Sequence, residues 1–224
     1  MIRLENTLVQ GWEAAIRGMR NPMNSWDKSD GRWVEDEPGT NYPQLVYEVG
    51  PADLALMKKL AMAGSDHRKF LRFITVSVDI TAPLYWWKEF DTYKVGTVAN
   101  SCSTMHKIHA KEFTLEDFSH DHLTLDGLEA LKRLVDQLNF ARIAFLETKD
   151  KAYWYEMIQL LPASYNQRRT VLMNYEVLRN MYHARKAHKL DCWRVGFCDW
   201  VKSLPYAELI TGGADDDGTG ESQA

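Results

Sequence analysis

The sequence has 224 residues, of which 45% are hydrophobic and 26% charged, a composition typical of a globular protein with a sizeable core. Its net charge of −4 disfavours a surface built to bind nucleic acid, and no apolar run approaches the ~20 residues that a membrane span requires. The three cysteines form no C-x-x-C pair and indicate neither a disulfide framework nor a metal site, which fits a reducing cytoplasm. From charge, hydropathy and cysteine content together, we expect a cytoplasmic protein with no membrane or nucleic-acid partner.

The first quarter of the chain predicts short elements separated by turn residues. In chain order these are a helix over residues 8–20, an extended loop over 25–44, a short strand over 45–49 and a helix over 52–63. Pro22 ends the first helix, and the loop is rich in Gly, Pro, Asp and Asn. Pro51 lies in the first turn of the second helix and Gly64 lies at its end.

Residues 69–80 predict a strand because apolar side chains alternate with a more polar set that includes Ser77 and Asp79. A helix over residues 83–93 then begins at Pro83 and carries several large aromatic side chains.

The second half of the chain predicts mostly helix: residues 125–147, a shorter helix between Asp150 and Pro162, and a long helical stretch over 166–203. Residues 1–207 are expected to form one domain, and 208–224 a disordered tail rich in Gly and Asp. The element order favours an α+β fold, an antiparallel sheet with packed helices, over a parallel βαβ sheet.

Two arginines and an amide recur within the last helical stretch. Asn174 and Arg185 are eleven residues apart, which places both on one face of a helix, and Arg168 lies six residues before Asn174. Such a face would bind an anion and the edge of a planar heterocycle. A solvated basic helix face explains the same pattern, because Arg179 and Lys186 lie on the same stretch.

Two segments resemble the flavin-dependent thymidylate synthases, also called thymidylate synthase complementing proteins (ThyX). The spacing of Leu161, Pro162, Tyr165, Arg168, Asn174 and Arg185 resembles the C-terminal signature of that family. His67, the strand that follows it and Ala82-Pro83 resemble the family's flavin-site histidine, central strand and next helix. The similarity covers roughly residues 8–204 and implies the family's α+β fold.

The resemblance also implies an activity, cofactor and partners. It implies reductive methylation of dUMP to dTMP with FAD, NADPH and methylenetetrahydrofolate, in a homotetramer whose sites draw on several subunits. By the resemblance, Arg168, Arg185 and Glu89 contact the nucleotide, and His67, Lys94 and Asn174 border FAD. The aromatic helix that carries Trp86, Trp87 and Phe90 offers a partner surface, although Trp86 alone equally suits the chain's own core.

One family motif is altered. Where the family has R-H-R and a following serine, this chain has Thr92-Tyr93-Lys94 and Thr97, so Lys94 is the only cation kept. Each lost charge-assisted hydrogen bond would cost about 1.5–3 kcal/mol of binding free energy. We therefore expect weakened binding of FAD and dUMP and weak or absent thymidylate synthesis. The alternative to an enzyme is a non-catalytic or re-purposed nucleotide-binding protein on the same fold.

Overall fold

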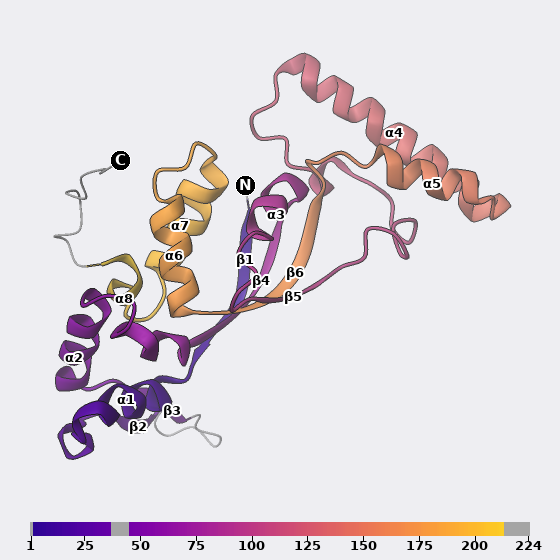
Figure 1. Ribbon diagram of the computed structural model, residues 1–224. Helices are drawn as coiled ribbons and strands as arrows, with labels where there is room; N and C mark the ends of the chain where they lie inside the picture. Colours follow the sequence, from indigo (N-terminus) through magenta and orange to yellow (C-terminus); the bar gives the residue numbers. More distant parts are fainter. Residues whose placement is uncertain (1, 37–44, 213–224) are drawn as a thin grey trace. The chain divides into compact units, whose positions relative to one another are not determined.

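The computed structural model describes residues 2–36 and 45–212 (Figure 1). These residues form two compact units. The first unit comprises residues 2–6, 78–94 and 98–171, and the second comprises residues 7–36, 45–77, 95–97 and 172–212. Three strands of the main sheet continue from one unit into the other, and the expectation of a single domain over residues 1–207 stays a prediction.

The main sheet has four strands in the order β1-β4-β6-β5. Their bounds are β1 Arg3–Gln10, β4 Thr75–Pro83, β6 Asn166–Asn174 and β5 Val98–Ser101. Together with the helices they make the mixed α+β fold with an antiparallel sheet, as predicted. The predicted strand 69–80 begins later than expected, because Arg68–Arg72 form the 3₁₀ helix η3. Within β4 the expected alternation holds: Val76, Val78 and Ile80 are buried.

The prediction of a helical stretch over 166–203 is wrong for its first part. Its first nine residues form β6, after which come helix α6 (Tyr175–Arg185), a π-helical turn (Cys192–Phe197) and helix α7 (Cys198–Lys202). Polar side chains on the inner face of β6 hid its period of two. Gln167 is buried because its amide donates to the Cys102 carbonyl oxygen at 2.7 Å, and Arg169 lies 4.1 Å from the Trp87 ring.

Helix α3 (Leu84–Phe90) belongs to the core of the first unit. Trp86, Trp87 and Phe90 are each at most 2% exposed, and the Trp86 and Phe90 rings stack with centroids 5.2 Å apart. The Trp87 indole N–H donates to the carbonyl oxygen of Gln167 at 2.9 Å. These rings therefore fill the chain's own core, and the expectation that they need a partner surface is wrong.

A helical hairpin completes the first unit. Helices α4 (Leu125–Thr148) and α5 (Lys151–Leu160) lie side by side in Figure 1, and the short η4 (Leu115–Asp117) precedes them. Thr124 and Asp150 cap them by accepting hydrogen bonds from the amides of Gly127 and Ala152. The buried side chains of this core are Ile108, Phe113, Phe118, Leu131, Val135, Leu138, Ala141 and Met157.

In the second unit, the expected helix 8–20 is partly a strand. Strand β1 continues to Gln10, and helix α1 spans Trp12–Arg20. Gly11 separates them with φ at 96°, and a Cβ at this position would lie 2.0 Å from the carbonyl oxygen of Phe73. Only glycine fits there, because that φ and that approach both exclude a side chain. The change from strand to helix is thus fixed at Gly11.

The second unit also contains two 3₁₀ turns, a strand pair and two further helices. They are η1 (Asn21–Met23), η2 (Trp26–Lys28), the antiparallel pair β2 (Arg32–Glu35) and β3 (Leu45–Glu48), α2 (Pro51–Met62) and α8 (Glu208–Thr211). Strand β2 lies inside the predicted loop 25–44, and α8 lies inside the predicted tail, with Leu209 and Ile210 buried. Both expectations are corrected for those residues; residues 37–44 and 213–224 lie outside the described part of the chain.

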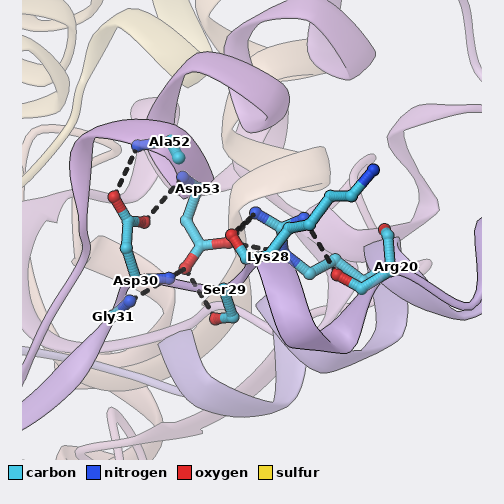
Figure 2. Close-up of polar contacts among 8 residues, drawn as sticks. Arg20, Lys28, Ser29, Asp30, Gly31, Ala52 and Asp53 are labelled. Atoms are coloured by element: carbon cyan, nitrogen blue, oxygen red, sulfur yellow. Dashed lines mark hydrogen bonds and ion pairs between the residues drawn. The ribbon is translucent and has the colours of Figure 1, made fainter.

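A buried ion pair fastens the loop before β2 to helix α2 (Figure 2). The Arg20 guanidinium donates to the Asp53 carboxylate at 2.7 Å and to the carbonyl oxygens of Ser25 and Lys28. The second carboxylate oxygen of Asp53 accepts from the hydroxyl of Ser29 and from the amides of Asp30 and Gly31. The charges are buried but fully partnered, which is the condition for tolerating them in a core.

Among the described helices, none combines the length and apolar character needed to cross a membrane.

Candidate functional site

Four polar side chains from neighbouring strands meet on one face of the main sheet, within the first unit. This sheet-face cluster consists of Asn6 on β1, Asp79 on β4, and Arg168 and Thr170 on β6. Asp79 accepts hydrogen bonds from Arg168 at 2.7 Å, from Thr170 at 2.6 Å and from Asn6 at 2.9 Å.

The strand period explains this convergence. Arg168 and Thr170 are two residues apart, so they point to the same side of β6, and Asp79 points to that side from the adjacent strand. Asn6 has a left-handed backbone with φ at 54°, a conformation that asparagine tolerates better than most residues. Its side-chain amide donates to Asp79.

Electrostatic interactions and hydrogen bonds keep both Asp79 and Arg168 ionised. The Thr170 hydroxyl, the Asn6 amide and the Arg168 guanidinium hold the pKa of the Asp79 carboxyl well below its usual range. The hydrogen bond to Asp79 and the charge of Asp79 raise the pKa of Arg168, and the charge of Glu5 adds to this. Asp79 is therefore a carboxylate, and Arg168 a guanidinium, throughout the physiological range.

A pocket of about 240 Å³ lies beside this cluster, lined by Asn100, Ser101, Cys102, Arg168 and Thr170. Strand β5 supplies Asn100 and Ser101, and the Cys102 amide donates to the carbonyl oxygen of Arg168 at 2.9 Å. The walls thus combine amide, hydroxyl and thiol groups with one guanidinium. This donor set can hydrogen-bond a small polar ligand but offers little positive charge.

Asn174 and Arg185 lie in the second unit, at the two ends of α6. The Asn174 side chain caps the helix by accepting from the Val177 amide at 3.0 Å. A Cβ built at Gly96 would lie 3.3 Å from the side-chain nitrogen of Asn174, so this glycine packs against the amide. The Arg185 guanidinium lies 4.7 Å from the centroid of the Trp193 ring. Since Arg168 and Asn174 are not helical, the expectation of a shared helix face is wrong.

The other predicted site residues divide between the units. Glu89, half-buried on α3, and Lys94, exposed after that helix, belong to the first unit with Arg168. His67, exposed at the start of η3, belongs to the second unit with Asn174 and Arg185. The expectation that His67, Arg168, Asn174 and Arg185 gather around one cleft stays a prediction.

Sequence reasoning missed three members of the sheet-face cluster, namely Asn6, Asp79 and Thr170. Asp79 had a usable signal, because it is the only ionisable side chain on the polar face of an otherwise uncharged strand. Asn6 had none, because its role depends on a backbone conformation that sequence does not announce.

Two other features of the second unit bear on charge and cavities. Arg179 is buried and donates to the carbonyl oxygens of Leu209 and Ile210, so it serves α8 rather than an open basic face. A larger hollow of about 460 Å³ includes Ile16, Arg20 and Tyr47 in its lining, but it contains none of the predicted site residues. Within the described ranges, no cluster of three or more His, Cys, Asp or Glu is suited to hold a metal ion.

Comparison with known proteins identifies the fold. No family model matches the sequence, and no curated protein is similar enough to be matched. In three dimensions the chain has the fold of the flavin-dependent thymidylate synthases, which confirms the fold expected from the resemblance.

Three solved structures illustrate this. Thymidylate synthase X from Helicobacter pylori, crystallised with FAD and dUMP, matches with a TM-score of 0.69 and 14% identity, over 94% of this chain and 98% of that one. A second crystal structure of the same kind of enzyme, also from Helicobacter pylori with FAD and dUMP, matches with a TM-score of 0.68 and 14% identity. The match covers 94% of this chain and 97% of that one. The UMP/dUMP methylase PolB from Streptomyces cacaoi, bound to 5-Br dUMP, matches with a TM-score of 0.58 and 11% identity over 94% of both chains.

Proposed function

We propose that this chain binds a pyrimidine nucleoside or nucleotide in the Arg168 pocket and that its FAD-dependent methylation of dUMP is weak or absent. The single observation that carries the first part is the placement of Arg168. The family resemblance assigns this residue to the nucleotide, and it lines a pocket whose other walls are uncharged hydrogen-bonding groups. The solved structures of the same fold bind dUMP or 5-Br dUMP, which supports a pyrimidine ligand.

The residues expected to hold FAD match one part of the cofactor and not the other. His67 and the side-chain nitrogen of Asn174 are suited to hydrogen-bond the edge of the flavin ring. The pyrophosphate needs cations, and Lys94 supplies one. Arg179, from the basic stretch that also carries Asn174 and Arg185, donates instead to the carbonyl oxygens of α8. The donor set therefore does not fit the whole cofactor, and we derive no catalytic step through FAD.

Two measurements test the proposal. Calorimetric titration with dUMP and with deoxyuridine should detect binding of at least one of them, and Arg168→Gln should abolish it. The purified protein should carry little or no flavin absorbance, and tritium release from labelled dUMP should stay near background with FAD and NADPH added. Absence of binding by both pyrimidine ligands would contradict the first part of the proposal.

A second candidate is a fully active thymidylate synthase assembled as a homotetramer. It is favoured by the joint presence of His67, Arg168, Asn174 and Arg185 at positions that the resemblance assigns to flavin and nucleotide. In such an assembly another subunit would have to supply the missing cations. A yellow protein of about four times 25.9 kDa by light scattering, with tritium release well above background, would favour this candidate over the first.

A further inference from the structure

The cation of the Arg168 pocket already has an anionic partner built into the sheet. Among the described residues that line the pocket, Arg168 carries the positive charge, and the others are neutral. Its guanidinium donates to the Asp79 carboxylate at 2.7 Å, and Glu5 lies near enough to influence it as well. The local charge around the guanidinium is therefore zero or negative, which is unusual for a site intended to hold a phosphate.

Asp79 is anchored independently of Arg168. Thr170 donates to one of its oxygens, and Asn6 donates to the other. If Arg168 turned toward a ligand, these two hydrogen bonds would keep the carboxylate in place, bonded to Thr170, which lines the same pocket. A phosphate monoester approaching Arg168 would then face a fixed negative charge within a few ångströms, at a cost in binding free energy.

We infer that Asp79 sets the charge of the ligand that this pocket accepts, favouring an uncharged pyrimidine nucleoside over its 5′-phosphate. The guanidinium retains N–H donors beyond the one that bonds Asp79, and these suit a hydroxyl or carbonyl oxygen of a neutral ligand. The pyrimidine part of this inference rests on the proposed function. The discrimination against phosphate does not, since it follows from the Arg168–Asp79 pair alone.

Inorganic phosphate is the probe that isolates the charge effect. Calorimetry at low salt should detect little binding to the wild-type chain and an affinity at least about tenfold higher for Asp79→Asn. The gain should disappear in Asp79→Asn/Arg168→Gln. The matched control is Asp91→Asn, which removes the same charge from the pair that Asp91 forms with Arg169 at 2.7 Å on the same unit. It should leave phosphate affinity within about twofold of wild type.

Two results would overturn the inference. If Asp79→Asn binds phosphate no better than wild type, Asp79 does not oppose the anion. If it binds phosphate worse, Asp79 instead orients Arg168 toward anions. Asp79→Ser serves as a second variant because serine also removes the charge while keeping a small polar group at the position. Either variant is used only if its circular-dichroism spectrum and melting transition show a folded chain.

Titrations with deoxyuridine and dUMP distinguish a failure of this inference from a failure of the proposed function. Wild type should bind deoxyuridine at least as tightly as dUMP, and Asp79→Asn should shift that preference toward dUMP by about tenfold. If neither pyrimidine ligand binds but phosphate binding appears in Asp79→Asn, the proposed function fails and the inference stands. If wild type binds dUMP more tightly than deoxyuridine, the inference fails and the proposed function stands.

Discussion

Two arginine–aspartate pairs of the same chemistry occupy opposite environments in this chain. In the second unit, the side chains of Arg20 and Asp53 are 5% and 0% exposed. In the first unit, those of Arg168 and Asp79 are 47% and 17% exposed and lie beside a pocket. Both aspartates also accept hydrogen bonds from a hydroxyl and from at least one amide nitrogen.

The two pairs differ in whether the guanidinium group of the arginine is exposed to solvent and to a ligand. All three nitrogens of the Arg20 guanidinium donate to Asp53 or to carbonyl oxygens, so the pair closes a loop even though Arg20 also lines the hollow of about 460 Å³. The Arg168 guanidinium makes its hydrogen bond to Asp79 and remains half-exposed at the pocket. Burial thus decides whether such a pair holds the fold or sets the properties of a site.

The largest effect on stability is expected at Asp53. Asp53→Asn leaves the Arg20 charge buried without a counter-ion, so we expect a loss of about 3–5 kcal/mol in the free energy of unfolding. Urea unfolding followed by circular dichroism measures this loss. The matched control is Asp79→Asn, the same chemical change at the exposed pair, which should cost much less. Equal losses in the two variants would contradict the division between a structural and a site-forming pair.

Asn174 combines a structural role with an expected ligand contact. Asn174→Ala removes the cap of α6 and should cost about 1 kcal/mol of stability. Asn174→Asp retains an oxygen that can cap the helix and should leave stability nearly unchanged. If the amide nitrogen also serves a flavin, both variants should lose flavin affinity, measured by fluorescence titration. Loss of affinity in Asn174→Ala alone would assign the residue to the fold only.

Acid tests whether the exposed pair is ionised as described. The folded pKa of Asp79 lies below its ordinary value of 3.8, so its contribution to stability is present above that pH and is lost as the pH falls further. The difference in unfolding free energy between wild type and Asp79→Asn should therefore stay constant from about pH 8 to about pH 5. Below about pH 4 the difference should shrink, and a difference that stayed constant down to about pH 2 would mean that the carboxyl keeps its ordinary pKa in the folded chain.

Much of the architecture was predictable from local patterns. The strand over Val76–Ile80 and helices α2, α4 and α5 were predictable because apolar period, caps and turn residues agree within each segment. The chain from 166 to 174 was not, since its inner face carries Gln167 and Arg169, whose burial depends on the Cys102 carbonyl oxygen and the Trp87 ring. Such partners are distant in sequence, so periodicity does not reveal them.

The candidate site was predictable only as far as single residues. The family spacing identified Arg168, but Asp79 lies 89 positions away and meets it through the adjacency of β4 and β6. Strand order is a property of the whole sheet, and no local feature of the sequence states it.

A third arginine–carboxylate pair lies fully at the surface, and we expect it to contribute least of the three to stability. Arg32 and Glu48 are cross-strand partners in β2 and β3, joined at 3.0 Å with side chains 73% and 51% exposed. Water solvates both charges before and after folding, so a double-mutant cycle of Arg32→Ala and Glu48→Ala should give a coupling of about 0.2–1 kcal/mol. The coupling should be weaker still in about 0.5 M salt, because the Debye length is shorter there and the exposed charges are more strongly screened. A coupling that approaches the loss at Asp53 would show that hydrogen-bond geometry, rather than burial, ranks these three pairs.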